Sequence, residues 1–107
     1  MRIMRILVMF DLPTGSKSEK KSYAAFRKFL LSDGYSMEQF SVYSRIALDL
    51  EHAKTHIDRL ERHKPKAGRI TVLTLTEKQY EHRKILICSP EYEQKNFDIA
   101  AQLTLVL

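Results

Sequence analysis

The sequence predicts an α+β fold whose elements follow the order β-α-β-β-α-β. Three observations lead to this prediction: short apolar runs, two segments in which apolar residues recur at helical spacing, and breakers containing proline or glycine between several of them. The chain of 107 residues has room for one domain with its own core. Its single cysteine excludes a disulfide within the chain.

The first predicted strand, residues 3–12, is almost continuously apolar, which is typical of a central strand covered on both faces. Asp11 interrupts this run near its end, shortly before Pro13. Aspartate and proline commonly begin a turn after a strand. A carboxylate at a strand end can also bind a metal ion or transfer a proton. This stretch alone leaves both explanations of Asp11 open.

The first predicted helix begins at about Lys17, because Ser16 and Glu19 match the capping-box pattern. It ends at Asp33 and Gly34, with the glycine just beyond the last turn. Five cations against two acids make this segment basic, and phosphate groups are the usual partner of such a surface. An ordinary solvated helix face would explain the pattern equally well. The candidate nucleic-acid-binding residues are Lys17, Lys20, Lys21, Arg27 and Lys28.

Residues 35–48 are rich in aromatic and β-branched side chains and contain no proline or glycine. Fourteen residues are long for one strand, so we expect two strands with a tight bend near Gln39 and Phe40. A second helix follows, with Asp49 as its N-cap and apolar residues at helical spacing. It stops before the breaker at residues 64–68.

Two further strands are predicted at residues 69–76 and 84–88, joined by the polar turn 77–82. The complete order matches the ferredoxin-like plan, an antiparallel sheet with both helices on one face, plus an appended fifth strand. This fifth strand is apolar on both faces, so we expect it to complete the sheet of a dimer partner. The domain then covers residues 1–90, and residues 91–107 form a C-terminal tail.

The predicted second helix carries His52 and His56 one turn apart, and His63 two turns further on. A histidine pair at this spacing can hold a transition metal. No nearby cysteine and no HExxH motif accompanies the pair, so we interpret the histidines as part of a solvated polar face. Glycine-rich phosphate loops and a Gly-x-Ser-x-Gly motif are also missing from the sequence, which argues against nucleotide-loop and serine-hydrolase chemistry.

Three stretches occur in order and at matching separations: MRILVMFDLP, FRKFLLSDGY and QFSVYSR. Together they resemble the CRISPR-associated protein two family, small adaptation proteins that partner the CRISPR integrase. The likeness spans essentially the whole chain and is close to the variety found beside a single large RNA-guided nuclease. This resemblance implies a ferredoxin-like homodimer in which the last regular strand of each subunit extends the sheet of the other.

By resemblance, Asp11 is the family's strand-end aspartate, which lies near its dimer mate and is proposed to bind Mg²⁺ for phosphodiester cleavage. Phe10 and Met37 depart from the family pattern, since many members have tyrosine and arginine there. Both changes remove a polar group near Asp11, which argues against nuclease chemistry and leaves DNA binding intact. A hard cation needs several oxygen ligands, so only two copies of Asp11 across a symmetric interface could form even a sparse metal site.

The expected function is a homodimeric scaffold for CRISPR spacer acquisition that bridges two integrase dimers and holds duplex DNA without sequence preference. RNA as a ligand and a Mg²⁺-dependent endonuclease activity at Asp11 are left open. The alternatives are a metal-dependent endoribonuclease or other nuclease as the main role, a related ribonuclease toxin, and a ligand-sensing regulatory domain of the same fold. The lone cysteine and the lack of a long apolar segment indicate a cytoplasmic protein with no membrane partner.

The acidic tail ends in the apolar stretch LTLVL, which a solvated tail has no reason to carry. We expect Leu103–Leu107 to dock on the integrase by adding a strand to one of its sheet edges, with Phe97 as a second anchor. The alternative is that this stretch packs on its own subunit and completes the core. The candidate docking residues are Phe97, Leu103, Leu105 and Leu107.

Overall fold

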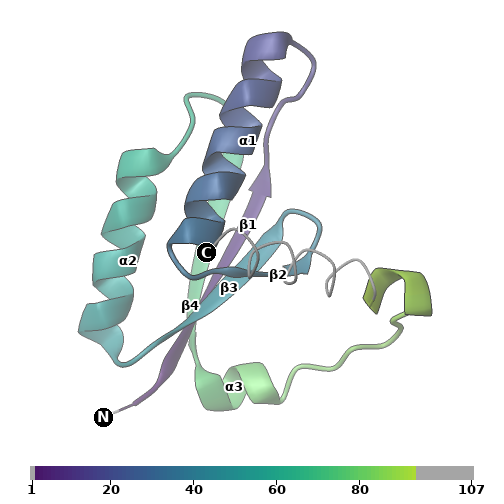
Figure 1. The fold of residues 1–107 in the computed structure, drawn as a ribbon. Coiled ribbons are helices and arrows are strands. Elements are labelled where there is room, and N and C mark those ends of the chain that lie inside the picture. Colours follow the sequence, from purple (N-terminus) through teal and green to yellow (C-terminus); the bar gives the residue numbers. More distant parts are fainter. Residues whose placement is uncertain (1, 94–107) are drawn as a thin grey trace.

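The computed structural model describes residues 2–93. It contains a four-stranded antiparallel sheet in the order β2-β3-β1-β4, with α1 and α2 on one face (Figure 1). The elements are β1 (Met4–Asp11), α1 (Lys17–Ser32), β2 (Ser36–Gln39), β3 (Val42–Ala47), α2 (Leu50–His63), β4 (Arg69–Thr76) and α3 (Glu77–Glu81). The predicted element order and the ferredoxin-like plan are therefore confirmed.

Two further sequence predictions concern the C-terminal tail and a membrane-spanning segment. The predicted docking residues Phe97, Leu103, Leu105 and Leu107 lie outside the described residues. Within residues 2–93, no helix is long and apolar enough to cross a membrane.

Local hydrogen bonds explain where the two long helices begin and where α1 ends. The Ser16 hydroxyl accepts a hydrogen bond from Glu19 N at 3.1 Å, and the Glu19 carboxylate accepts one from Ser16 N at 2.9 Å. This is the predicted capping box. Beyond the last turn of α1, Gly34 has a φ of 89°, a left-handed conformation that suits glycine. Asp49 caps α2, as predicted, by accepting a hydrogen bond from His52 N at 2.9 Å.

Two segments near the end of the described chain differ from their predictions. Residues 77–82, predicted as a polar turn, contain the five-residue helix α3, which Thr76 and Gln79 cap reciprocally. Such a short helix shows no periodicity in a sequence. Residues 84–88 form no strand with any other part of residues 2–93, and Leu86 is 91% exposed. Because the predicted pairing involves a second subunit, it stays a prediction.

The strand β1 is central, but within residues 2–93 its helix-side face alone is fully buried, in contrast to the predicted cover on both faces. Met4, Ile6, Val8 and Phe10 lie on the helix side of the sheet and are at most 7% exposed. The alternate residues of β1 lie on the opposite face, here called the open face, and are half-buried or exposed. A continuous apolar run does not distinguish a strand covered by helices on both faces from one with an open second face.

The core contains two buried tyrosines whose hydroxyl groups differ. Tyr35 is 2% exposed, and its hydroxyl is the one buried side-chain nitrogen or oxygen in the described part of the chain that has no hydrogen-bond partner. Burial raises the pKa of this phenol. The Tyr43 hydroxyl, in contrast, accepts a hydrogen bond from Arg27 Nε at 2.9 Å. The two residues therefore form a matched pair for measuring the cost of an unsatisfied hydroxyl.

Tyr35→Phe should leave the free energy of unfolding unchanged or raise it by about 1 kcal/mol, because it removes a buried hydroxyl that has no partner. Tyr43→Phe should lower the free energy of unfolding by about 1 kcal/mol, because Arg27 Nε loses its acceptor. Urea unfolding of both variants checks the pair. A loss in Tyr35→Phe as large as that in Tyr43→Phe would contradict this difference.

Candidate nucleic-acid interface and active site

Asp11 is the last residue of β1 and is exposed. The preceding Phe10 is fixed in the core, where its ring packs edge-to-face on Phe26 with centroids 5.3 Å apart. Because side chains alternate along a strand, Asp11 belongs to the open face. Its partner in the antiparallel β1–β4 ladder is Arg69, the first residue of β4. A carboxylate and a guanidinium group therefore lie on neighbouring strands at the end of β1.

The predicted site residues do not include Arg69. A signal for it exists in the sequence, since an antiparallel pairing of the strands predicted at residues 3–12 and 69–76 brings the start of the second opposite the end of the first. That pairing depends on the order of strands in the sheet, which only the structure establishes.

The described residues of one chain do not form a magnesium site at Asp11. Within residues 2–93, no group of three or more His, Cys, Asp or Glu side chains could hold a metal ion. Mg²⁺ prefers oxygen ligands in near-octahedral geometry, whereas this strand end offers one carboxylate beside the cation Arg69. Phe10 and Met37 pack in or against the core and add no polar ligand. The metal role of Asp11 needs a second copy of the chain and stays a prediction.

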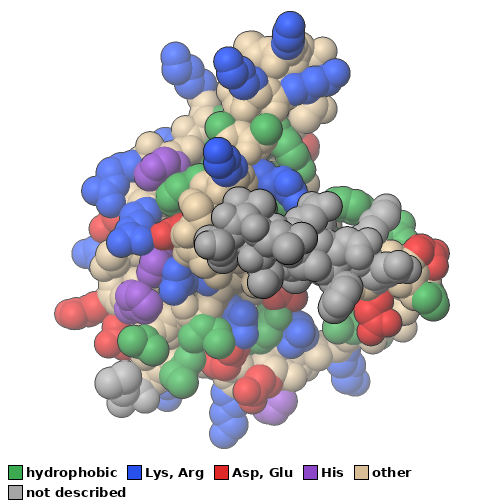
Figure 2. Space-filling view, in the orientation of Figure 1, with side chains coloured by type: hydrophobic (Ala, Val, Ile, Leu, Met, Phe, Trp, Pro, Cys, Tyr) green, Lys and Arg blue, Asp and Glu red, His purple; other side chains and the backbone are tan. Residues whose placement is uncertain are grey.

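Four of the five predicted nucleic-acid-binding residues are exposed on α1. They are Lys17, Lys20, Lys21 and Lys28, here called the α1 lysines. Arg27 differs, because it is half-buried and its Nε donates to the Tyr43 hydroxyl. Figure 2 shows Lys and Arg side chains gathered at the end of the molecule where α1 begins. The α1 lysines therefore form a basic surface, while Arg27 also ties α1 to β3.

Two of the predicted solvated histidines form a hydrogen-bonded chain on α2. His56 is 5% exposed, with its Nδ1 2.9 Å from Asp33 Oδ2 and its Nε2 3.1 Å from His52 Nε2. Leu48 N donates to His52 Nδ1 at 3.0 Å, so neutral His52 carries its proton on Nε2, facing His56. The prediction of a solvated face is wrong for His56, because the packing of α2 against the end of α1 brings Asp33 to it.

Asp33 is the acceptor at the centre of this network. His56 donates to one of its carboxylate oxygens, and Arg59 Nη1 donates to the other at 2.7 Å. Burial by itself would raise the pKa of Asp33, but the hydrogen bonds from His56 and Arg59 outweigh burial and lower the pKa below its ordinary value of 3.8. The network joins the end of α1 to α2 and so has a structural role.

Asp33→Asn should lower the free energy of unfolding by roughly 1–3 kcal/mol at pH 7, because it removes the charged acceptor of two hydrogen bonds. A group whose pKa is lowered by folding contributes stability above its unfolded pKa, and this contribution is lost as the pH falls through the folded pKa. The gap in stability between wild type and variant should therefore shrink below about pH 4. Thermal melts from neutral to acidic pH check this, and a gap that persists unchanged through the acid range would contradict it.

Gly68 holds the segment between α2 and β4 against the end of β1. Its φ is 106°, and a Cβ at this position would lie 2.7 Å from the backbone oxygen of Asp11 and 2.7 Å from Leu12 Cδ2. Gly15, in the loop before α1, has more room, because the nearest atom to a Cβ would be Glu19 Oε1 at 3.5 Å. A side chain is therefore excluded at the first glycine and tolerated at the second.

Gly68→Ala should lower the free energy of unfolding by about 2 kcal/mol, because alanine is strained at positive φ and its Cβ meets backbone atoms. The control Gly15→Ala should change the free energy of unfolding by less than about 0.5 kcal/mol. Urea unfolding compares the two variants. Equal stabilities for both would show that the close approach of residue 68 to Asp11 does not exist in solution.

Comparisons with known proteins show which family this chain is similar to. Residues 4–83 match the family described as CRISPR associated protein Cas2. A CRISPR-associated endoribonuclease Cas2 of Acidovorax ebreus is 47% identical over 102 residues, which are 95% of this chain and 99% of the relative. The protein of the same name from Streptococcus mutans serotype c is 52% identical over 77 residues, or 72% of this chain and 71% of the relative.

A third CRISPR-associated endoribonuclease Cas2, from Treponema denticola, is 40% identical over 95 residues, which are 89% of this chain and 94% of the relative. The family match runs from the first residue of β1 to just beyond α3, and so includes the whole sheet, Asp11 and Arg69. The resemblance inferred from three short stretches is confirmed, and this chain belongs to the CRISPR associated protein Cas2 family.

Proposed function

We propose that this protein is a homodimeric scaffold for CRISPR spacer acquisition in the cytoplasm, which bridges integrase dimers and binds duplex DNA without sequence preference. The observation that carries the proposal is the exposed surface of α1 lysines, which begins shortly after Asp11. Lysine contacts to phosphate groups supply affinity without reading base sequence. Membership of a CRISPR-associated family favours this function over a toxin or a ligand sensor.

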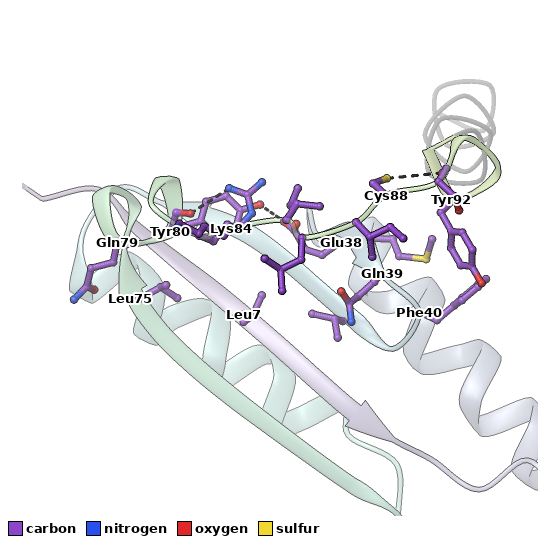
Figure 3. A pocket seen from close by; sticks show the side chains of 17 residues that line it. Leu7, Glu38, Gln39, Phe40, Leu75, Gln79, Tyr80, Lys84, Cys88 and Tyr92 are labelled. Atoms are coloured by element: carbon purple, nitrogen blue, oxygen red, sulfur yellow. Dashed lines mark hydrogen bonds between the residues drawn. The ribbon is translucent and has the colours of Figure 1, made fainter.

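A second copy of the chain is the cover that we propose for the open face. Leu73 and Ile46 on this face are 50% and 44% exposed. A cavity of about 810 Å³ lies between the open face and the segment of residues 84–89, which passes over it (Figure 3). Ile85 in this segment is 68% exposed. If each copy laid its segment along the sheet of the other, both sets of apolar side chains would be buried.

Cleavage of nucleic acid at Asp11 is the second candidate function. The relatives are named endoribonucleases, which favours RNA as the substrate. We propose that Asp11 from two copies would bind Mg²⁺ weakly, since each chain offers one carboxylate at this strand end. The scaffold and nuclease functions would then depend on different residues, the α1 lysines and Asp11, and can be tested separately.

The most direct test of the scaffold function is assembly. The protein is mixed with its cognate CRISPR integrase and a short DNA duplex, and the mixture is sized by light scattering after gel filtration. A joint particle larger than either protein is the expected result. Separate elution of the three components at micromolar concentration would contradict the scaffold.

The variant Lys17→Gln/Lys20→Gln/Lys21→Gln should bind duplex DNA more weakly and with a smaller salt dependence. If each lysine contacts one phosphate, the negative slope of log affinity against log salt becomes shallower by about 0.9 for each contact that is lost. Fluorescence anisotropy over a range of salt concentrations measures the slope. Arg27 is left in place, because its removal would also break the bond to Tyr43. A slope and an affinity equal to those of the wild type would show that the α1 lysines do not contact the DNA.

Asp11→Asn should abolish any Mg²⁺-dependent cleavage of labelled RNA or DNA while the variant still binds duplex DNA, because asparagine keeps the shape but loses the charge of the ligand. The melting temperature should change by less than about 4 °C, which is roughly 1 kcal/mol for a chain of this size. Cleavage that survives in the variant would place the chemistry elsewhere. A large drop in melting temperature would make Asp11 a turn-forming residue instead.

A further inference from the structure

Residues 62–69 run from the last turn of α2 to the first residue of β4. They carry a second cluster of cations at the end of the molecule where β1 ends. Its cations are all exposed. They are Arg62, Lys64, Lys66 and Arg69. Lys64 forms an ion pair with Glu61 at 3.1 Å, whereas the side chains of the other three make no ion pair within residues 2–93. Arg62 and Lys66 therefore have no ion-pair partner in the described part of the chain, and Arg69 has the Asp11 carboxylate opposite it on β1.

This segment is held at both ends by contacts with other elements. At its start, the His63 ring stacks on the ring of Phe29 from α1, with centroids 3.9 Å apart and planes 9° apart. His63 Nδ1 also donates to the Arg59 carbonyl oxygen at 2.8 Å. At its end, Gly68 lies directly against the backbone of Asp11. A connection fixed in this way loses little backbone freedom when it binds a ligand, so the backbone that carries these cations is preorganised.

Both basic elements lie on the same end of the fold as Asp11. Arg69 faces Asp11 across the β1–β4 ladder, and cross-strand partners of this kind have Cβ atoms about 5 Å apart. The chain enters α1 a few residues after Asp11, and Figure 1 shows the start of α1 and the connection from α2 to β4 at one end of the molecule. The cations of the two elements therefore flank the strand end that carries Asp11.

We propose that Arg62, Lys66 and Arg69 contact phosphate groups of the same nucleic acid that the α1 lysines bind, with Arg69 holding the phosphate nearest Asp11. This inference rests on the proposed function and extends the interface to a segment beyond α1. A guanidinium group donates two parallel hydrogen bonds to a phosphate, which a lysine cannot do. Arg69 also offsets the repulsion that the Asp11 carboxylate would exert on a phosphate passing the strand end.

A nucleic acid fits this surface better than an acidic protein would. Cations contributed by two separate elements around one strand end match regularly spaced phosphates along a backbone. Lysine and arginine side chains on exposed surfaces contact phosphate groups and do not read base edges in a fixed pattern, so we expect little dependence on base sequence. The competing ligand is an acidic surface on a protein partner. The experiment below distinguishes it from a nucleic acid.

The test compares two triple variants of equal charge. Arg62→Gln/Lys66→Gln/Arg69→Gln removes the proposed contacts, and Arg2→Gln/Lys54→Gln/Lys78→Gln removes three exposed cations from the N-terminus, the first half of α2 and α3. Binding of a short duplex is followed by anisotropy over a range of salt concentrations. The first variant should make the negative slope of log affinity against log salt shallower by about 2.7, or 0.9 per lost contact, and the control should change it by much less.

The single variants Arg69→Gln and Arg69→Lys guard against a folding defect and test the arginine itself. Arg69→Gln should make the slope shallower by about 0.9. Arg69→Lys should keep the slope, because the charge remains, and should still lower the affinity for the duplex. Equal slopes for the first triple variant and the control, with binding lost in the α1 lysine variant, would overturn this inference and leave the proposed function standing. Normal duplex binding with lost integrase assembly would instead assign the segment to an acidic protein partner and also overturn it. If the wild type binds no nucleic acid, the proposed function and this inference both fail.

Discussion

Within residues 2–93 the sheet carries its long helices on one face, and the partly exposed opposite face is the feature on which the proposed assembly depends. Part of the open face is occupied by polar groups. Arg5 donates to both carboxylate oxygens of Glu77 at 3.0 and 2.6 Å and lies 4.0 Å from the centre of the Tyr80 ring. The Tyr80 hydroxyl donates to Glu38 on β2. This cluster holds α3 against the open face of the sheet. Residues 84–89 follow shortly after α3 in the chain.

The remainder of the open face is apolar, and residues 2–93 leave part of it exposed. Leu73 and Ile46 are about half exposed, and the cavity beneath residues 84–89 separates that segment from the sheet (Figure 3). Exposed aliphatic side chains on a sheet and on the segment above it are an unstable combination for an isolated subunit. A second copy that covers both, as we propose, would bury these apolar residues and would add a second Asp11 to the assembly.

The antiparallel arrangement also explains why Asp11 and the two groups of cations lie at one end of the molecule. β1 ends where α1 begins and where α2 passes into β4, so one strand end is surrounded by two basic elements. The core fixes this strand end through Phe10, while Gly68 fixes the connection beside it. In the function that we propose, Asp11 would supply a carboxylate for chemistry and the cations around it would supply the affinity for nucleic acid. Nuclease activity and nucleic-acid binding would then depend on different residues, so a protein with this arrangement can bind strongly and cleave weakly.

Features that depend on neighbours in the chain could be predicted from the sequence, and features that depend on the packing of distant segments could not. Ser16 with Glu19, Gly34 and Asp49 act through hydrogen bonds or backbone conformation within a few residues, and all three helix ends were predictable. Burial of His56 depends on Asp33, which is 23 residues away in the sequence. The pairing of Arg69 with Asp11 depends on the order of the strands.

The mass of the protein in solution tests the central claim, that a second copy covers the open face. Light scattering at micromolar concentration should give twice the 12.5 kDa of one chain. Leu73→Glu, which places a charge on the open face, should shift the mass toward one chain, whereas the control Leu50→Glu, on the exposed start of α2, should leave it doubled. A wild-type protein that stays a stable monomer at this concentration would contradict the account.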